Sequence, residues 1–409
     1  MKTVFQTGIL WLACIVLLGG TQWAAGQDWP QWLGPNRDGK VAGFTAPQTW
    51  PDTLTQKWKV TVGNGCATPA LVGDKLYVFT REGDNEILRC LNAATGEEVW
   101  KEGYQVEAIS GPDARQFSGP RSSPAVANGK IVTFGVTGIL SCFNVTDHKL
   151  LWRKNDFSGT PRFHTSASPF ILDGLCIAYV GGSNNGALVA YDLTSGEQKW
   201  SWDQDGPAYA SPVAATVDGV KTIIALSDSH VIAVNASDGK LLWEVPFEVQ
   251  RMAYNAATPI VDGQRVIYAS QGGGTVAVKL SKDGDGLKAQ PLWTNPDNAV
   301  QFNTPVLKNG LVFSISADNK FVCINAENGQ TAWTNPAGGQ RGFGSIVDAG
   351  AVLIGLTNGS KLSVFEANAE AYREVASYKV SDGQTTAYPV VSGNRIFVKD
   401  EDSVILWTL

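Results

Sequence analysis

Short apolar runs alternate with tight turns along most of the chain. Residues 130–134 and 139–143 are two such runs, and an Asn-Gly pair stands directly before the first. Runs of about five residues bounded by turns of this kind predict β-hairpins. No segment beyond the N-terminal leader sustains the period of an amphipathic helix, so the pattern predicts an all-β chain.

A nine-residue unit that ends in tryptophan repeats along the chain. Four copies have the form Asn/Asp-x-x-x-Gly-x-x-x-Trp, at residues 92–100, 192–200, 235–243 and 325–333. A fifth copy has His148 in the glycine position and ends at Trp152, and a looser copy ends at Trp293. Together with Trp58, seven tryptophans recur at intervals of 40 to 52 residues, which is typical of a repeat architecture.

A second landmark, a small residue followed by proline, marks the start of the repeats. These anchors are Thr68, Ser123, Ser168, Ser211, Thr258 and Thr304, with Gly344-Ser345 in this place without a proline and Tyr388-Pro389 at the last start. Each of the eight units has room for four short strands, the content of a propeller blade. The sequence therefore predicts an eight-bladed β-propeller of four-stranded antiparallel blades.

The last repeat is one strand short. Only 21 residues follow Tyr388, whereas residues 56–62 form a strand that precedes the first anchor. We expect this N-terminal strand to become the outer strand of the last blade, because that closes the ring and leaves no open edge. The chain then divides into a signal peptide at 1–26, an N-terminal extension docking on the ring at 27–55, and the propeller at 56–409.

The repeat assigns structural roles to its most regular residues. The turn glycines are expected to need positive φ, and His148 suits this position because histidine tolerates left-handed backbone better than most residues. The tryptophans are expected to pack between neighbouring blades. Cys90, Cys142 and Cys323 hold equivalent positions on different blades, which places them beyond the roughly 7 Å that a disulfide spans, so we expect buried thiols.

The N-terminus has the form of a secretory signal. Lys2 precedes an apolar core at residues 9–18, and small residues lead up to Gly26. The core is too short for a bilayer, which needs about 20 residues. A lipoprotein signal ending at Cys14 is the alternative, although the apolar run continues past that cysteine. We expect cleavage after Gly26 and an exported protein, periplasmic or extracellular.

The charge of the mature chain excludes one class of partner. Loss of Lys2 from a chain of net charge −6 leaves −7. A protein this acidic is a poor ligand for nucleic acid or anionic membranes. No other apolar segment is long enough to cross a membrane, and we expect a monomer.

The anchors and tryptophan units resemble the PQQ-like propeller repeat. That repeat is found in quinoprotein alcohol dehydrogenases and in BamB, the propeller lipoprotein of the outer-membrane barrel-assembly machinery. The resemblance covers residues 56–409 and is specific for fold rather than function. The stretch WPQWLGPNRDG, residues 29–39, resembles the start of many secreted bacterial propellers of this class.

The oxidoreductase function that this resemblance implies lacks support in the chain. Quinoprotein dehydrogenases resemble one another in adjacent cysteines near the cofactor and in acidic residues for a metal ion and a general base, but no two cysteines are adjacent here. The residues just before the anchors should ring the mouth of the central funnel, and none is acidic, although Glu107 or Asp113 could reach in. They are Asn64, Arg121, Arg162, His164, Tyr209, Arg251, Tyr254, Asn255, Gln301, Asn303, Arg341 and Tyr388. We therefore expect no PQQ, no metal ligands and no catalytic residues.

Four arginines and a histidine converge on this mouth in an acidic protein. Flat apolar surface is expected nearby, from Tyr209, Tyr254, Phe302, Phe343 and Tyr388. Because arginine forks bind carboxylates and phosphates, we hypothesise a site for an anionic ligand or an acidic peptide. The predicted ligand-binding residues are Arg121, Arg162, His164, Arg251, Tyr254, Asn303, Arg341 and Tyr388. In the alternative, the arginines pair with backbone carbonyls and loop acids and only hold the loops together.

The sequence thus favours a non-catalytic binding or scaffolding propeller of the cell envelope, with a protein partner or a small anionic ligand. The alternative is a PQQ-dependent dehydrogenase of alcohols or sugars. Trp29 and Trp32 lie outside the repeat register, and the prolines beside them bar regular strand pairing. We expect the two tryptophans to dock near the seam between the first and last blades as a clasp.

Overall fold

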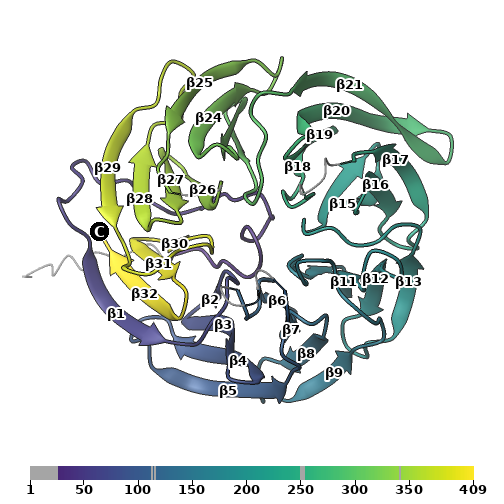
Figure 1. Cartoon of the computed structure of the whole chain (residues 1–409), viewed down its shortest axis with the longest axis horizontal. Helices are drawn as coiled ribbons and strands as arrows, with labels where there is room; N and C mark the ends of the chain where they lie inside the picture. Colours follow the sequence, from purple (N-terminus) through teal and green to yellow (C-terminus); the bar gives the residue numbers. More distant parts are fainter. Residues whose placement is uncertain (1–25, 112–113, 115–116, 249–253, 340–341) are drawn as a thin grey trace, which may run out of the picture.

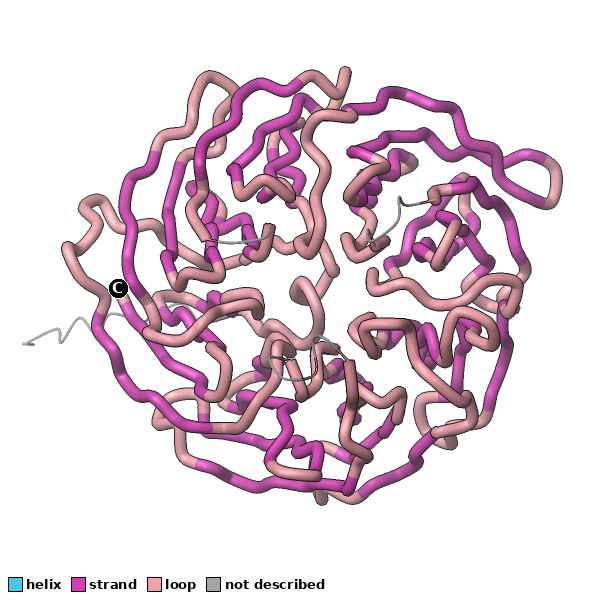
Figure 2. Tube along the Cα trace, viewed as in Figure 1, coloured by secondary structure: helices cyan, strands magenta, loops and turns pink. Residues whose placement is uncertain are grey.

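The computed structural model describes residues 26–111, 114, 117–248, 254–339 and 342–409, so the predicted signal peptide lies almost wholly outside the described residues. These residues form strands and loops, and they include no helix that is long and apolar enough to cross a membrane (Figure 2). The strands form eight four-stranded antiparallel sheets around a central axis (Figure 1). The predicted eight-bladed β-propeller is confirmed.

We number the blades along the chain and call their strands A to D from the axis outward. Blades 1 to 4 contain β2 (Ala70–Val72), β3 (Lys75–Glu82), β4 (Asn85–Asn92) and β5 (Glu98–Gln105); β6 (Ala125–Ala127), β7 (Lys130–Phe134), β8 (Leu140–Asn144) and β9 (Leu150–Lys154); β10 (Phe170–Leu172), β11 (Leu175–Val180), β12 (Ala187–Asp192) and β13 (Gln198–Trp202); and β14 (Val213–Val217), β15 (Val220–Leu226), β16 (His230–Asn235) and β17 (Leu241–Pro246). Blades 5 to 8 contain β18 (Ile260–Asp262), β19 (Arg265–Ser270), β20 (Gly274–Asp283) and β21 (Gly286–Asn295); β22 (Val306–Lys308), β23 (Leu311–Ile315), β24 (Lys320–Asn325) and β25 (Thr331–Pro336); β26 (Gly344–Ala349), β27 (Val352–Thr357), β28 (Lys361–Phe365) and β29 (Glu374–Lys379); and β30 (Val390–Ser392), β31 (Arg395–Lys399), β32 (Ser403–Thr408) and β1 (Thr55–Thr61).

The ring closes through its last blade, as predicted. β1 pairs antiparallel with β32, from Thr55 opposite Thr408 to Thr61 opposite Ser403. The purple first strand lies beside the yellow last strand in Figure 1. Closure in this way joins the two ends of the ring by backbone hydrogen bonds and leaves no gap between blades 8 and 1.

The tryptophan of one blade packs on the C–D turn of the next. A Cβ atom on Gly196 would lie 2.7 Å from a ring carbon of Trp152, and one on Gly239 would lie 2.6 Å from a ring carbon of Trp200. The indole N–H of Trp152 donates to the Leu193 carbonyl in that same turn, at 3.1 Å. These glycines also have positive φ, +71° at Gly196 and +72° at Gly239, so both predictions for the repeat are confirmed.

Histidine replaces the turn glycine once, in blade 2. His148 has a φ of +61°, and its ring stacks on Trp100 with the ring centroids 4.3 Å apart. In the other blades a side chain at this position would collide with the indole, but the His148 ring lies flat against that of Trp100. Cys90, Cys142 and Cys323 are buried and unpaired, as predicted from their equivalent positions.

The anchors form a belt of hydrogen bonds around the axis. In each of these hydrogen bonds, the backbone N–H of one anchor donates to the hydroxyl of another. The bonds run from Ser123 to Ser168 (2.9 Å), Ser168 to Ser211 (2.8 Å), Ser211 to Thr258 (3.3 Å), Thr258 to Thr304 (2.9 Å), Thr304 to Tyr388 (2.7 Å) and Tyr388 to Thr68 (3.0 Å). Blade 7 lacks the anchor with proline, and the longer Tyr388 side chain spans this blade to reach Thr304.

The N-terminal extension fills the axial channel. Trp29 is 1% exposed and exchanges two backbone hydrogen bonds with Leu71 of blade 1, both 2.8 Å long. Trp32 donates from its indole to the Thr258 hydroxyl of blade 5 at 2.9 Å, and its ring meets Tyr388 of blade 8 edge-on at 4.8 Å. The purple segment crosses the centre of the ring in Figure 1.

The channel location differs from the expected clasp at the seam. The two tryptophans do contact blades 1 and 8, but Arg37 also donates to the Pro169 carbonyl of blade 3 at 3.1 Å, and Val41 to the Asp348 carbonyl of blade 7 at 2.8 Å. Eight inner strands around one axis leave a channel that their own side chains do not fill, and an apolar void is costly. The extension fills that void, which a seam clasp would leave open.

Candidate functional site

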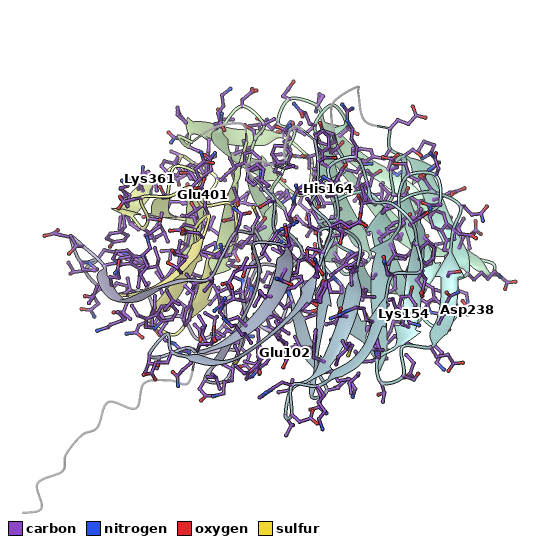
Figure 3. The ribbon with its side chains drawn as sticks, turned by 60° about the horizontal axis from the view of Figure 1, so that its bottom comes forward. Glu102, Lys154, His164, Asp238, Lys361 and Glu401 are labelled. Atoms are coloured by element: carbon purple, nitrogen blue, oxygen red, sulfur yellow. The ribbon has the colours of Figure 1, made fainter. Side chains whose placement is uncertain are left out.

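The links between blades and the B–C turns lie at the same end of the ring, because consecutive strands run antiparallel. We call this end the mouth. His164, from the link between blades 2 and 3, and Glu401, from the B–C turn of blade 8, both lie toward the upper face of the ring in Figure 3. The repeated C–D turns lie at the opposite end, so the mouth is built from the segments that the repeat constrains least.

Three of the predicted site residues lie together on the mouth. The Arg121 guanidinium donates to the carbonyls of Phe163 and Phe117, the second at 3.1 Å, and so ties two neighbouring links together. Arg162 is exposed, and its guanidinium lies 5.3 Å from the centre of the Phe163 ring. Tyr254 meets Phe163 edge-on, with the ring centroids 4.8 Å apart.

In this structure the His164 side chain contacts the backbone of a neighbouring link. Its backbone is left-handed, with a φ of +65°, and its Nε2 lies 3.1 Å from the Ser110 carbonyl oxygen. The contact joins the link between blades 2 and 3 to the link between blades 1 and 2.

Two predicted site residues are buried inside the ring. The Asn303 amide donates to the Ile315 carbonyl and accepts from the Ile315 N–H at 3.2 Å, and the residue is 1% exposed. Tyr388 is 2% exposed, and its hydroxyl accepts from Thr304 N–H and donates to Thr304 carbonyl oxygen. Neither side chain offers surface to a ligand in this structure. Arg251 and Arg341 lie outside the described residues.

Six half-buried aromatic side chains cover the mouth, and we call them the aromatic collar. They are Phe117, Phe163, Tyr209, Tyr254, Phe302 and Phe343, each from a different link between blades. Phe302 and Phe343 stack at 4.2 Å and 11°, and Phe343 reaches Phe117 at 5.9 Å. Tyr254 then connects Phe302, at 6.4 Å, to the other two rings.

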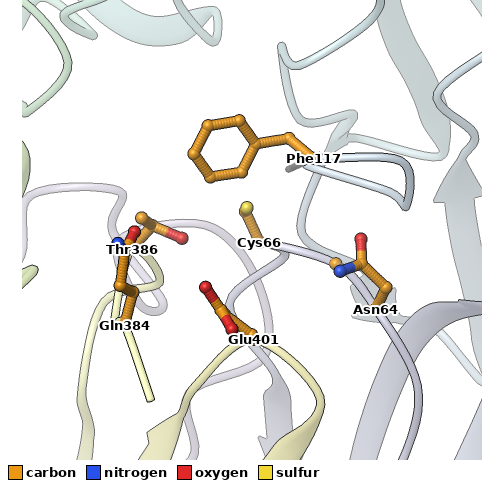
Figure 4. A pocket seen from close by; sticks show the side chains of 7 residues that line it. Asn64, Cys66, Phe117, Gln384, Thr386 and Glu401 are labelled. Carbon is orange, nitrogen blue, oxygen red and sulfur yellow. The ribbon is translucent and has the colours of Figure 1, made fainter. Parts of the chain in front are cut away.

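A small pocket opens beside the collar, at the seam between blades 8 and 1. It is lined by Asn64, Gly65, Cys66, Phe117, Gln384, Thr386 and Glu401. The Cys66 thiol and the Glu401 carboxylate point toward the space under the Phe117 ring (Figure 4). Burial raises the pKa of the Cys66 thiol, so the thiol stays protonated at neutral pH.

A buried lysine holds the seam below this pocket. Lys399 is 1% exposed, and its ammonium donates to four carbonyl oxygens, those of Gly63 (3.3 Å), Gly65 (3.0 Å), Asp400 (2.6 Å) and Glu401 (3.1 Å). Burial lowers the pKa of Lys399 to about 8. The lysine joins the B–C turn of blade 8 to the link that enters blade 1.

A histidine and a carboxylate form a second polar cluster at the mouth end of blade 4. Asp205 Oδ2 accepts from His230 Nδ1 at 2.9 Å, from the Ser227 hydroxyl at 2.6 Å and from the Ser229 hydroxyl at 2.7 Å. Burial alone would raise the pKa of Asp205, but these hydrogen bonds outweigh it and lower the pKa. Ser229 contacts the same ring nitrogen that faces the aspartate, so the three groups do not form a nucleophilic triad.

Four residues at the mouth were not predicted from the sequence: Phe117, Phe163, Cys66 and Glu401. The ring of the mouth was predicted from the residues directly before the anchors, which include no acid, and Glu107 and Asp113 were the acids that could reach in. Glu401 comes instead from a B–C turn, which faces the same end of each blade. The order of turns along the repeat could therefore have placed Glu401 at the mouth.

The described residues of the mouth do not fit a quinone cofactor with a metal ion. Phe302 and Phe343 stack on each other and leave no gap between them for a third flat ring. The pocket beside the collar is small, because even its empty volume of about 210 Å³ includes open solvent. In the described part of the chain, no three His, Cys, Asp or Glu side chains gather as metal ligands.

Comparison with known proteins identifies relatives along nearly the whole chain. Residues 83–335 match the family model described as "Outer membrane protein assembly factor BamB". The protein of that name from Yersinia pestis is 22% identical over 371 residues, 86% of this chain and 88% of its own length.

Two solved structures show the same fold. BamB from Moraxella catarrhalis superposes with a TM-score of 0.66 at 15% identity, over 87% of this chain and 100% of that one. Quinohemoprotein alcohol dehydrogenase from Comamonas testosteroni superposes with a TM-score of 0.68 at 14% identity, over 93% of this chain and 80% of that one. At these identities the two structures support the fold alone and do not distinguish scaffold from enzyme.

Proposed function

The chain belongs to the outer membrane protein assembly factor BamB family, and from that premise we propose that it is a non-catalytic propeller of the cell envelope. In this role it is exported to the periplasm and holds a protein partner during outer-membrane protein assembly. The family match over residues 83–335 carries the proposal. The mouth supports it, because the links between blades form an aromatic surface there that the repeat itself does not require.

We place the binding surface at the mouth and propose an acidic segment of the partner as its ligand. Arg162 is exposed and has no ion-pair partner among the described residues. A partner carboxylate would meet its guanidinium fork in bidentate fashion. Arg121 takes a structural part, since it is tied to two carbonyls, and it holds the links that present Arg162.

We further propose that the protein works without PQQ. The stacked collar and the small pocket support this, because the collar would have to open to admit the cofactor. With added PQQ, calcium and a primary alcohol, the purified protein should reduce no redox dye above the buffer rate. Sustained dye reduction would favour the dehydrogenase instead.

The envelope role is tested by deleting the gene in the source bacterium. Folded β-barrel proteins migrate differently in unheated gels, so their amount is measured directly in outer-membrane extracts. We expect less folded barrel protein in the deletion strain and recovery when the wild-type chain is restored. Unchanged amounts of folded barrel proteins would contradict the proposed function.

A further inference from the structure

The aromatic collar is not explained by the stability of the ring. None of its six side chains belongs to the hydrophobic cores formed by the described residues, although the same links contribute other residues, such as Ala257 and Val300, to those cores. Each collar ring is half-buried and keeps part of its surface toward solvent. Contiguous exposed apolar surface with a polar rim is typical of an interaction site.

The geometry of the collar favours an aromatic guest. Its rings already meet edge-on, as Tyr209 and Tyr254 do at 5.6 Å and 83°, or stacked, as Phe302 and Phe343 do. A further ring can join such a cluster in either arrangement, and aromatic pairs gain about 0.5–1.5 kcal/mol beyond the area that they bury. An aliphatic side chain gains the burial but not this additional term.

The charge beside the collar favours an acid next to that guest. The Arg162 guanidinium lies over the Phe163 ring of the collar and has no ion-pair partner among the described residues. An extended ligand that places an aromatic ring on the collar turns the side chain two positions away to the same side, within reach of this cation. A carboxylate at that position would be complementary in charge.

The channel below the collar is closed, so a ligand must approach from the mouth alone. Trp32 and Tyr388 meet edge-on at 4.8 Å inside the ring, and Leu33 is 2% exposed. A chain therefore cannot thread through the propeller. It lies across the mouth and presents side chains to the collar.

We propose that the collar binds an aromatic side chain with an acidic residue two positions away, in an extended segment of an outer-membrane β-barrel protein that has not yet folded. The identity of the client rests on the proposed function. Strands of such barrels carry girdles of aromatic residues at both membrane interfaces, and these side chains are accessible only before insertion. The collar thus recognises a feature that folding and insertion remove.

Three fluorescently labelled peptides test this preference on the full-length mature protein by fluorescence anisotropy. They share an extended sequence of alternating Thr and Val and differ at one pair of positions two residues apart, which carries Phe and Asp, Leu and Asp, or Phe and Asn; we call these peptides Phe-Asp, Leu-Asp and Phe-Asn. We expect the Leu-Asp peptide to bind about tenfold more weakly than Phe-Asp, the upper end of the aromatic term. The Phe-Asn peptide should lose about threefold, as expected for one exposed ion pair.

Two variants locate the effect. Phe302→Leu keeps an apolar side chain but removes one ring of the collar, so it should reduce the preference for Phe-Asp over Leu-Asp. The control is Leu151→Ala, which removes apolar surface from the outer strand of blade 2, where Leu151 is 41% exposed. This variant should keep the tenfold preference. The melting temperature of each variant shows that it is folded.

The outcomes separate this inference from the proposed function. Equal binding of Phe-Asp and Leu-Asp to the wild-type protein overturns the aromatic preference, and a weaker Phe-Asn peptide would then still support the acidic ligand. No binding of any peptide overturns the collar as a site for extended segments. The envelope role is judged separately, by the folded barrel proteins of the deletion strain.

Discussion

Each turn glycine lies under the tryptophan of the neighbouring blade, so one absent methyl group sets how closely two blades approach. Gly196 makes this contact with Trp152, and its φ of +71° adds a second reason for glycine. A turn glycine elsewhere, Gly219, has a φ of +83° but nothing within 4 Å of the position of a Cβ atom. The two positions therefore separate backbone strain from steric overlap.

Gly196→Ala should destabilise the protein more than Gly219→Ala. Both substitutions carry the left-handed strain of about 1 kcal/mol. Only the first also forces a methyl group against Trp152, which overpacking data place at about 1–3 kcal/mol more. Urea unfolding measures both variants, and equal losses of stability would show that the tryptophan contact does not restrict the turn.

Asp205 should make stability depend on acid pH. Its pKa in the folded chain lies below the ordinary value of 3.8, so its contribution is fully present above that value and is lost as the pH falls through the folded pKa. The stability gap between wild type and Asp205→Asn should be constant near pH 6 and shrink below about pH 4. Urea midpoints between pH 3 and 6 measure this gap, and a gap that widens with acid would contradict the assignment.

At the scale of elements, the repeat predicts the blades and leaves the N-terminal extension undetermined. Strand pairing is local, so the spacing of Trp152 and its counterparts is enough to place four strands in each unit. The extension has no repeat partner, and its position depends on the width of a channel that exists only once eight blades have closed. The buried position of Tyr388 was not predicted for a similar reason. Its hydrogen bonds to Thr304 depend on the absence of a proline anchor in the blade before it.

Trp29 is the most buried side chain of the extension and is 1% exposed. Trp29→Ala should cost about 3–5 kcal/mol, the range for removing a buried tryptophan. Trp50→Ala, at a half-buried position of the same extension, should cost much less. Thermal unfolding compares the two variants, and similar losses would contradict a channel-filling role for Trp29.

For the whole molecule, the structure separates a uniform ring from a specialised mouth. The turns at the opposite end are copies of one another, as Gly239 and Gly329 illustrate with φ values of +72° and +74°. The links between blades at the mouth have only the anchor residues in common. Outside the anchors, each link contributes different side chains. The sequence placed Arg162, Tyr254 and flat apolar surface from Tyr209, Phe302 and Phe343 at the mouth. It did not predict Phe117 and Phe163 or the meeting of all six rings in one collar, because these depend on the spatial arrangement of six links.

The central claim is that the protein works as a scaffold whose mouth contacts its partner. Site-specific photo-crosslinking in living cells tests it most directly, with benzoylphenylalanine at Phe163 on the mouth or at Asn328 on the opposite end. The photoreactive residue keeps an aromatic ring in the collar, and Asn328 is exposed on a repeated turn. We predict crosslinks from position 163 to outer-membrane β-barrel proteins or to their assembly machinery, and none to these proteins from position 328. Crosslinks to these proteins from position 328 but not from 163 would contradict the account.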